Sequence, residues 1–155
     1  MAIEDVFKGA KNAMALYYAF FNTVAQEIGM ERTLALQAKT DETMGVMQGK
    51  MMKEQMGIKE LDAKTAFPLM KAVYEGFGIV MEVIEESPTA VRFKCLKCPG
   101  YAEGLDNEIR ESVCRNGGLK FADAILKQLN PNASLKLRKF RSAPDDFCEE
   151  EIVIG

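Results

Sequence analysis

The chemically reactive side chains of this sequence gather between Arg92 and Cys114. Three of the four cysteines lie there, namely Cys95 and Cys98 with C-x2-C spacing and then Cys114, whereas Cys148 lies near the C-terminus. Two residues between cysteines allow both sulfurs to reach one metal ion. The sequence has no histidine, which removes Ser–His and Cys–His catalysis and every histidine-containing metal site. The pattern therefore predicts a cysteine-centred site.

Four converging thiolates would satisfy a zinc ion or, as second choice, an iron–sulfur cluster. Zinc is preferred because the sequence gives no other sign of redox chemistry. The predicted metal ligands are Cys95, Cys98, Cys114 and Cys148. A straight helix from Tyr101 would carry Cys114 roughly 20 Å away. Either the helix is broken around Gly104, or Cys114 is not a ligand and a water, Tyr101 or Glu150 takes its place. Two other interpretations stay open: an isolated reactive thiol, and four cysteines that serve only as small buried side chains.

Side-chain alternation in the last strand places Glu150 on the same face as Cys148 and Ile152. A carboxylate on the inner face is a ligand, an acid or base with a raised pKa, or a group near the strand end in water. If the chain is an enzyme, Cys98 is the predicted catalytic thiolate and Glu150 its acid–base partner. An unassisted thiol is mostly protonated at pH 7, which favours binding over catalysis.

The ten methionines and several aromatic side chains could line a pliable apolar pocket for a small molecule. Methionines at helical spacing also serve as ordinary core residues. Tyr101 follows Cys98 by three residues and is the hydroxyl best placed to reach whatever the cysteines hold. The other predicted ligand-binding residues are Tyr17, Phe21 and Tyr74.

Hydrophobic periodicity divides the chain into helices and hairpins. Helices are predicted over residues 3–28, 31–56 and 63–74. A first hairpin is predicted over residues 77–84 and 91–96, and a second over 135–140 and 147–154. Between the hairpins, helical spacing returns with a break at Gly117–Gly118. In the second helix, Gly45 and Gly49 lie four residues apart, which either lets another backbone approach or weakens the helix.

The order of elements predicts an α+β fold. Hairpins exclude an all-parallel sheet, so we expect N-terminal helices packed on a four-stranded antiparallel sheet made of two hairpins. Residues 1–155 are expected to form a single domain, with a helical half over 1–75 and a hairpin–helix–hairpin half over 76–155 that carries the cysteines.

Composition excludes several classes of protein. Hydrophobic residues make up 48% and charged residues 28%, as in soluble globular proteins. A net charge of -3 argues against non-specific nucleic-acid binding, and no apolar run of about 18 residues predicts a membrane span. No signal peptide is evident. We therefore expect a cytoplasmic protein, where metal binding or thiol reactivity is commoner than structural disulfides.

Several runs suggest a family. KCPGYAEGL, the later Cys114 and the terminal DDFCEEEIVI resemble the L-2-amino-thiazoline-4-carboxylic acid hydrolase-like proteins and the related 4-vinyl reductase domains, and YYAFFNTVAQEIGMERTLAL fits the N-terminal segment of the former. The resemblance implies a fold like that of the TRAPP trafficking subunits, often dimeric, with an apolar ligand cavity. In aromatic-sensing relatives, cysteines and a glutamate hold zinc beside that cavity. Cys98 and Cys148 match two of those ligands, whereas the other two fall near Leu137 and Phe140.

Two functional hypotheses follow. The first is a cysteine-centred metal-binding domain with an apolar small-ligand pocket, acting as a sensor or carrier. The alternative is a thiolate- or metal-dependent hydrolase that opens a small heterocycle such as L-2-amino-thiazoline-4-carboxylate, since Cys98, Cys114 and Cys148 match the recurring cysteines of that family. The expected partners are a small apolar or heterocyclic ligand and a second copy of the chain, which contacts the first through the Met-rich helix around residues 44–56.

Overall fold

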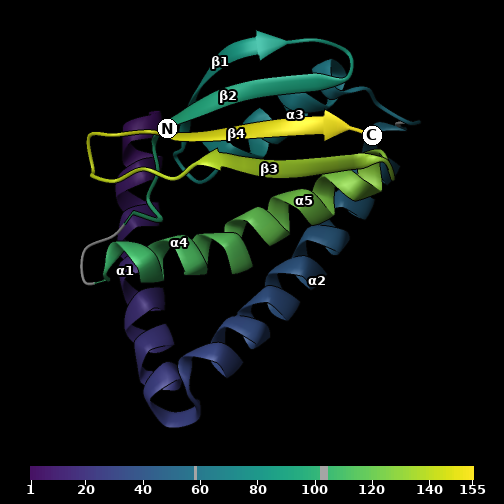
Figure 1. The fold of residues 1–155 in the computed structure, drawn as a ribbon. Helices are drawn as coiled ribbons and strands as arrows, with labels where there is room; N and C mark the ends of the chain where they lie inside the picture. Colours follow the sequence, from purple (N-terminus) through teal and green to yellow (C-terminus); the bar gives the residue numbers. More distant parts are fainter. Residues whose placement is uncertain (58, 102–104) are drawn as a thin grey trace.

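The computed structural model describes residues 1–57, 59–101 and 105–155. Figure 1 shows its elements in chain order. The helices are α1 (Ile3–Ile28), α2 (Met30–Met56), α3 (Ala63–Glu75), α4 (Asn107–Asn116) and α5 (Gly118–Leu129). The strands are β1 (Val80–Glu86), β2 (Ala90–Lys97), β3 (Ala133–Lys139) and β4 (Cys148–Ile154).

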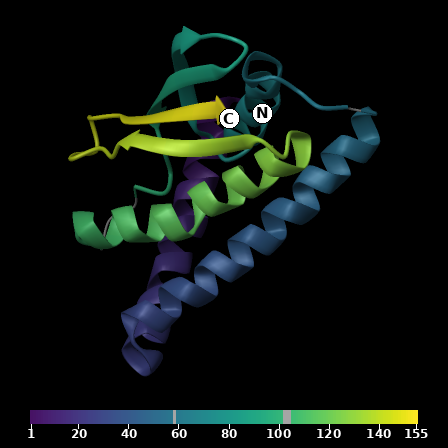
Figure 2. The same cartoon turned by 45° about the vertical axis from the view of Figure 1, so that its right-hand side comes forward.

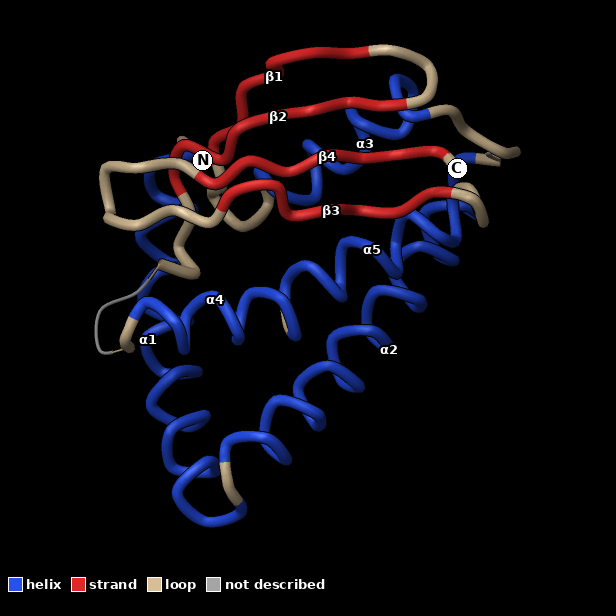
Figure 3. Tube along the Cα trace, in the orientation of Figure 1, coloured by secondary structure: helices blue, strands red, loops and turns tan. Residues whose placement is uncertain are grey.

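The four strands form one antiparallel sheet in the order β1-β2-β4-β3. The two hairpins are joined where β2 pairs with β4, in an unbroken register from Ala90 opposite Val153 to Cys95 opposite Cys148. Figure 3 shows the four strands at the top of the view, with α5, α4 and α2 below them and α3 behind them. The predicted α+β fold with a sheet of two hairpins is confirmed.

The core lies between the sheet and the two helices α3 and α5, which supply Phe67, Met70, Ile125 and Leu126 to it. Phe93 and Ile152 face these helices from the inner side of the sheet and are fully buried. Helix α2 packs mainly over α5 rather than on the strands. The helices on the sheet therefore come from both halves of the chain.

Two glycines of α2 let that helix approach α5 closely (Figure 2). A Cβ at Gly45 would meet the carbonyl of Phe121 and lie 2.8 Å from the Cβ of Ala124. A Cβ at Gly49 would lie 2.8 Å from Gln128 side-chain atoms. Of the two alternatives for this glycine pair, the structure favours close approach of another backbone.

The outer face of the sheet carries charges whose sign alternates from strand to strand. One row across the sheet shows this alternation. Glu151 on β4 lies between Lys136 on β3 and Arg92 on β2. Arg92 in turn lies opposite Glu85 on β1. Ion pairs join Arg92 to Glu85 at 3.2 Å and Arg138 to Glu151. Basic and acidic residues therefore pair across the strands, and the charges of this face largely neutralise one another.

Helix α1 contacts the end of the sheet near its N-terminus, where Glu4 pairs with Lys97 of β2 at 2.8 Å. It meets α2 at a sharp turn at Gly29, so that the two helices form a V (Figure 1). Its C-terminal half packs on α4 through a second apolar cluster that contains Tyr18, Phe21, Leu105 and Val113. None of the helices in the described ranges is long and apolar enough to cross a membrane.

The strand boundaries differ from the sequence prediction by up to three residues. Strand β1 begins at Val80 rather than residue 77, because Gly78 adopts a positive φ of 74° in a turn against the backbone of Phe7. The helix break at Gly117–Gly118 is confirmed, since α4 ends at Asn116 and α5 begins at Gly118. The proposed break around Gly104 lies outside the described residues.

We predict that Gly45→Ala destabilises the protein although alanine is the better helix former. The added methyl group would overlap the α5 backbone, and overpacking of this kind costs about 1–3 kcal/mol. Urea denaturation followed by circular dichroism measures the change. Gly9→Ala is the matched control, because nothing lies within 4 Å of a Cβ at Gly9 on α1. It should stabilise the protein by up to about 1 kcal/mol. Equal effects of the two substitutions would contradict the close α2–α5 contact.

Candidate functional site: a buried cluster of thiols

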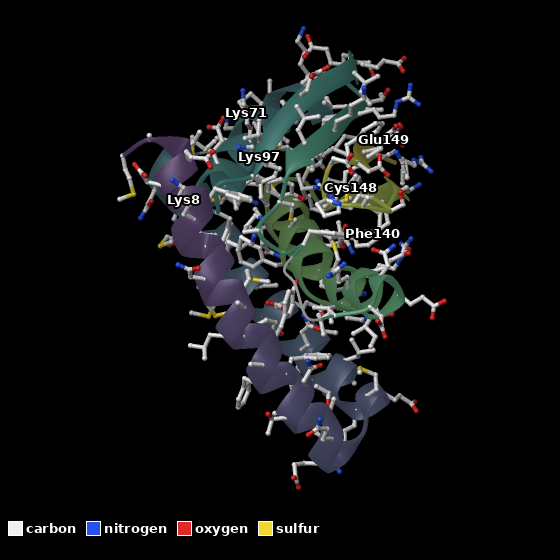
Figure 4. The ribbon with its side chains drawn as sticks, turned by 90° about the vertical axis from the view of Figure 1, so that its left-hand side faces the viewer. Lys8, Lys71, Lys97, Phe140, Cys148 and Glu149 are labelled. Carbon is white, nitrogen blue, oxygen red and sulfur yellow. The ribbon has the colours of Figure 1, made fainter. Side chains whose placement is uncertain are left out.

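Two of the cysteines face each other across neighbouring strands. Cys95 near the end of β2 lies directly opposite Cys148 at the start of β4, and both side chains are buried in the core. Figure 4 looks toward this end of the sheet and shows Cys148 close to Phe140. All four cysteines are free thiols.

Glu150 lies on the same inner face and is 6% exposed, as strand alternation predicted. The Tyr74 hydroxyl of α3 donates a hydrogen bond to its Oε2 at 2.7 Å. The Cys95 thiol donates to its Oε1 at 3.6 Å. Burial raises the pKa of the Glu150 carboxyl, while the Tyr74 and Cys95 hydrogen bonds oppose that rise. The carboxyl group is thus held by two donors inside the core.

Arg141, which the sequence analysis did not identify, supplies the buried positive charge of the cluster and is 2% exposed. Its Nη2 donates to the Cys95 carbonyl at 2.6 Å, and its Nη1 reaches the Leu96 and Pro144 carbonyls at 3.4 Å. Its Nε and its backbone N–H each donate to Cys148 Sγ at 3.5 Å. Arg141 follows β3 in an aperiodic turn, so no hydrophobic pattern indicated that it is buried.

Cys98 and Cys114 complete the group. Helix α4 begins only at Asn107, so Cys114 lies about two turns into it rather than at the end of a long helix. Burial, followed by the nearby Glu150 carboxylate and the Cys98 thiol, raises the pKa of Cys114 well above its ordinary value. Burial likewise raises the pKa of Cys98 to about 11. The structure therefore brings all four cysteines and Glu150 into one electrostatically coupled region.

Among the described residues, no three or more cysteine, aspartate or glutamate side chains come close enough together to hold an ion. The predicted metal-binding character is corrected on this finding. Cys95 instead donates a hydrogen bond to Glu150, and Cys148 accepts one from Arg141. The preference for zinc over an iron–sulfur cluster stays a prediction from the sequence alone.

The same environment disfavours thiolate catalysis by Cys98 with Glu150. A thiol with a pKa of about 11 is almost entirely protonated at neutral pH and is a weak nucleophile. The pKa of Cys95 is also raised, first by burial and then by Glu150. The carboxyl group already accepts hydrogen bonds from Tyr74 and Cys95. The two residues predicted as a catalytic pair therefore lack an activated nucleophile.

The four predicted ligand-binding aromatic residues do not share one pocket. Tyr74 belongs to the main core, whereas Tyr17 and Phe21 belong to the second cluster on α1. The Tyr101 ring lies between two guanidinium groups, 4.2 Å from Arg110 and 5.7 Å from Arg141. Two open hollows lie elsewhere. One, of about 490 Å³, is at the α1–α2 turn around Gly29, and a smaller one lies beside Ser87 on the sheet.

The arrangement of helices on a four-stranded antiparallel sheet is shared with a subunit of a trafficking complex. That solved structure is trafficking protein particle complex subunit 3 from Naegleria fowleri, described as covalently bound to palmitic acid. It is similar with a TM-score of 0.65 and 14% identity, over 95% of each chain. No family model matches the sequence, and no curated protein matches it.

The similarity confirms a TRAPP-subunit-like fold and, at this identity, the fold alone. No family model supports the narrower resemblance to the aminothiazoline hydrolase-like proteins or the 4-vinyl reductase domains. The similar structure is a subunit of a trafficking complex, not a hydrolase or a metal protein. The predicted metal-binding, hydrolase-like character is therefore corrected to a domain with a TRAPP-subunit-like fold.

We predict that the free energy of unfolding falls as the pH rises from 9 to about 11, and falls less in Cys98→Ser. The folded Cys98 thiol stays protonated up to a pKa of about 11, whereas the unfolded thiol ionises near its ordinary value of 9.0. Ionisation therefore stabilises the unfolded state, by on the order of 2 kcal/mol for Cys98 at about 1.4 kcal/mol per pKa unit. Urea denaturation across this pH range measures both slopes. Identical slopes for the two proteins would contradict a protonated, buried Cys98.

Proposed function

We propose that this protein is an assembly subunit whose domain pairs with a second copy through an exposed apolar surface of α2. The surface, called here the α2 stripe, consists of Leu36, Met44, Met47 and Met51. The single observation that carries the proposal is the exposure of these four large apolar side chains on a helix whose opposite side packs on α5.

The members of the α2 stripe share one side of the helix because they recur at spacings of eight, three and four residues, with Thr40 between Leu36 and Met44. Met47, at its centre, is 60% exposed. The packed side of α2 instead contacts α5 through Gly45 and Gly49. The stripe is therefore not needed for the domain's own core. Each large apolar side chain removed from water contributes about 1.5–3 kcal/mol when fully buried, so its exposure favours a partner.

The outer face of the sheet is a poorer candidate for assembly. Its exposed apolar residues, such as Leu96, are single side chains among the charged rows of Arg92, Glu151 and their neighbours. Burying those rows would remove solvated ion pairs from water with little gain. The helical side thus provides the larger continuous apolar surface.

A second copy is the partner that requires the fewest further features. In a two-fold pair the same patch meets itself, so one apolar stripe on a helix is sufficient. Methionine side chains are unbranched and adapt to one another's shape, which suits a self-complementary contact. The subunit of a trafficking complex with the same fold gives general support for a role in assembly.

The predicted small apolar or heterocyclic ligand does not enter this proposal. Tyr74 lies in a different apolar cluster from Tyr17 and Phe21, so these residues do not line one ligand cavity. A role as sensor or carrier therefore stays a prediction from the sequence alone.

We predict that Met47→Glu converts a dimer into a monomer, because the two-fold contact would bury two carboxylates against each other. Sedimentation velocity at several micromolar concentrations measures the effect. Met56→Glu is the matched control: Met56 lies on the same helix and is similarly exposed at 54%, but it lies off the α2 stripe. It should leave the dimer unchanged. A native protein that is monomeric at every concentration would overturn the proposal, and so would equal loss of pairing in both variants.

A further inference from the structure

We propose that Cys95 and Cys148 form an oxidisable dithiol, which a small peroxide converts into a disulfide that joins β2 to β4. The inference uses only the thiol cluster and does not depend on the pairing of two copies. It assigns a modification site to the two cysteines that lie opposite each other in the sheet.

The strand register brings the two sulfurs within bridging reach. Residues directly opposite in an antiparallel pair have Cα atoms about 4.5 or 5.5 Å apart, depending on the hydrogen-bonding position. Both spacings fall inside the range of about 4.4–6.8 Å that disulfides span. Cys95 and Cys148 also point to the same side of the sheet, since both are buried in the core. The bond therefore requires little movement of the backbone.

The surroundings of Cys148 suit the sulfur that is oxidised first. Its Sγ accepts hydrogen bonds from the Nε and the backbone N–H of Arg141, both at 3.5 Å. Two donors, one of them part of a guanidinium cation, lie beside that sulfur and can hydrogen-bond it while it reacts with an oxidant.

The surroundings of Cys95 suit the second, resolving thiol. Its S–H points at Glu150 Oε1, 3.6 Å away, so a carboxylate is in place to take the proton when the sulfur attacks. Tyr74 holds the other oxygen of that carboxylate at 2.7 Å and fixes its orientation. The two cysteines thus have different neighbours, a cation for one and a base for the other.

The reaction balances with one peroxide. The Cys148 thiolate attacks a peroxide oxygen; an S–O bond forms, the O–O bond breaks, and the released hydroxide takes the proton that Cys148 gave up. Cys95 then attacks the Cys148 sulfur; the S–S bond forms, the S–O bond breaks, and the Cys95 proton leaves through Glu150 with the hydroxide as a second water. The two sulfurs together lose two electrons, which the peroxide gains.

Burial limits the class of oxidant. Cys95 is 3% exposed and Cys148 is 6% exposed, so a reagent the size of a peptide disulfide does not reach them without opening the core. Hydrogen peroxide is little larger than water. We therefore expect hydrogen peroxide to form the bond faster than oxidised glutathione does.

The test treats the folded, reduced protein with hydrogen peroxide and maps disulfides by non-reducing peptide mass spectrometry. The expected product links the Cys95 and Cys148 peptides and disappears on reduction. Cys98→Ser and Cys114→Ser are matched controls that should keep the link. In Cys95→Ser, Cys148 should stop at the sulfenic acid, which a dimedone probe labels.

Several outcomes would overturn the proposal. They are a link between other cysteines as the main product, oxidation of Cys98 or Cys114 in preference to Cys148, and four intact thiols after prolonged exposure to peroxide. The decisive experiment uses the native chain, so its result does not depend on whether a cysteine variant folds. Circular dichroism before and after oxidation verifies that the reaction occurs in the folded state.

Discussion

The end of the sheet depends on two buried charged side chains that the fold must keep satisfied. Arg141 donates to three backbone carbonyls and to the Cys148 sulfur, and Glu150 accepts from Tyr74 and Cys95. Removing one partner of such a network leaves a polar group in the core at a cost of about 1–3 kcal/mol, and more for a charge. These hydrogen bonds fix the positions of β2, β4, α3 and the segment after β3 relative to one another.

This network explains why cysteines gather there without forming a metal site. A thiol is small enough to fit beside a buried carboxyl and guanidinium group, and it donates or accepts weakly as required. Cys95 donates to Glu150, whereas Cys148 accepts from Arg141. The same weak bonds distinguish the two sulfurs chemically, so packing and reactivity arise from one set of contacts.

The two sides of the molecule differ in how they meet solvent. On the outer face of the sheet, acidic residues lie opposite basic residues on the neighbouring strands, whereas α2 exposes a stripe of large apolar side chains. The close α2–α5 contact separates the two roles of α2, because Gly45 and Gly49 allow packing on one side while larger side chains remain on the other. The helices thus build the core and offer the surface suited to assembly.

The sequence by itself determined the fold class, the strand partners within each hairpin and the inward direction of Glu150, since these follow from local periodicity and turn residues. It also placed the helix break at Gly117–Gly118 correctly. Only the tertiary structure decided that Arg141 is buried and that α2 lies on α5, because both depend on contacts between distant segments. The spacing C-x2-C suggested a pair of metal ligands. The pairing of β2 with β4 instead places the Cys95 thiol where it donates a hydrogen bond to Glu150. Local patterns report which face a side chain takes, whereas its partners depend on the packing of the whole chain.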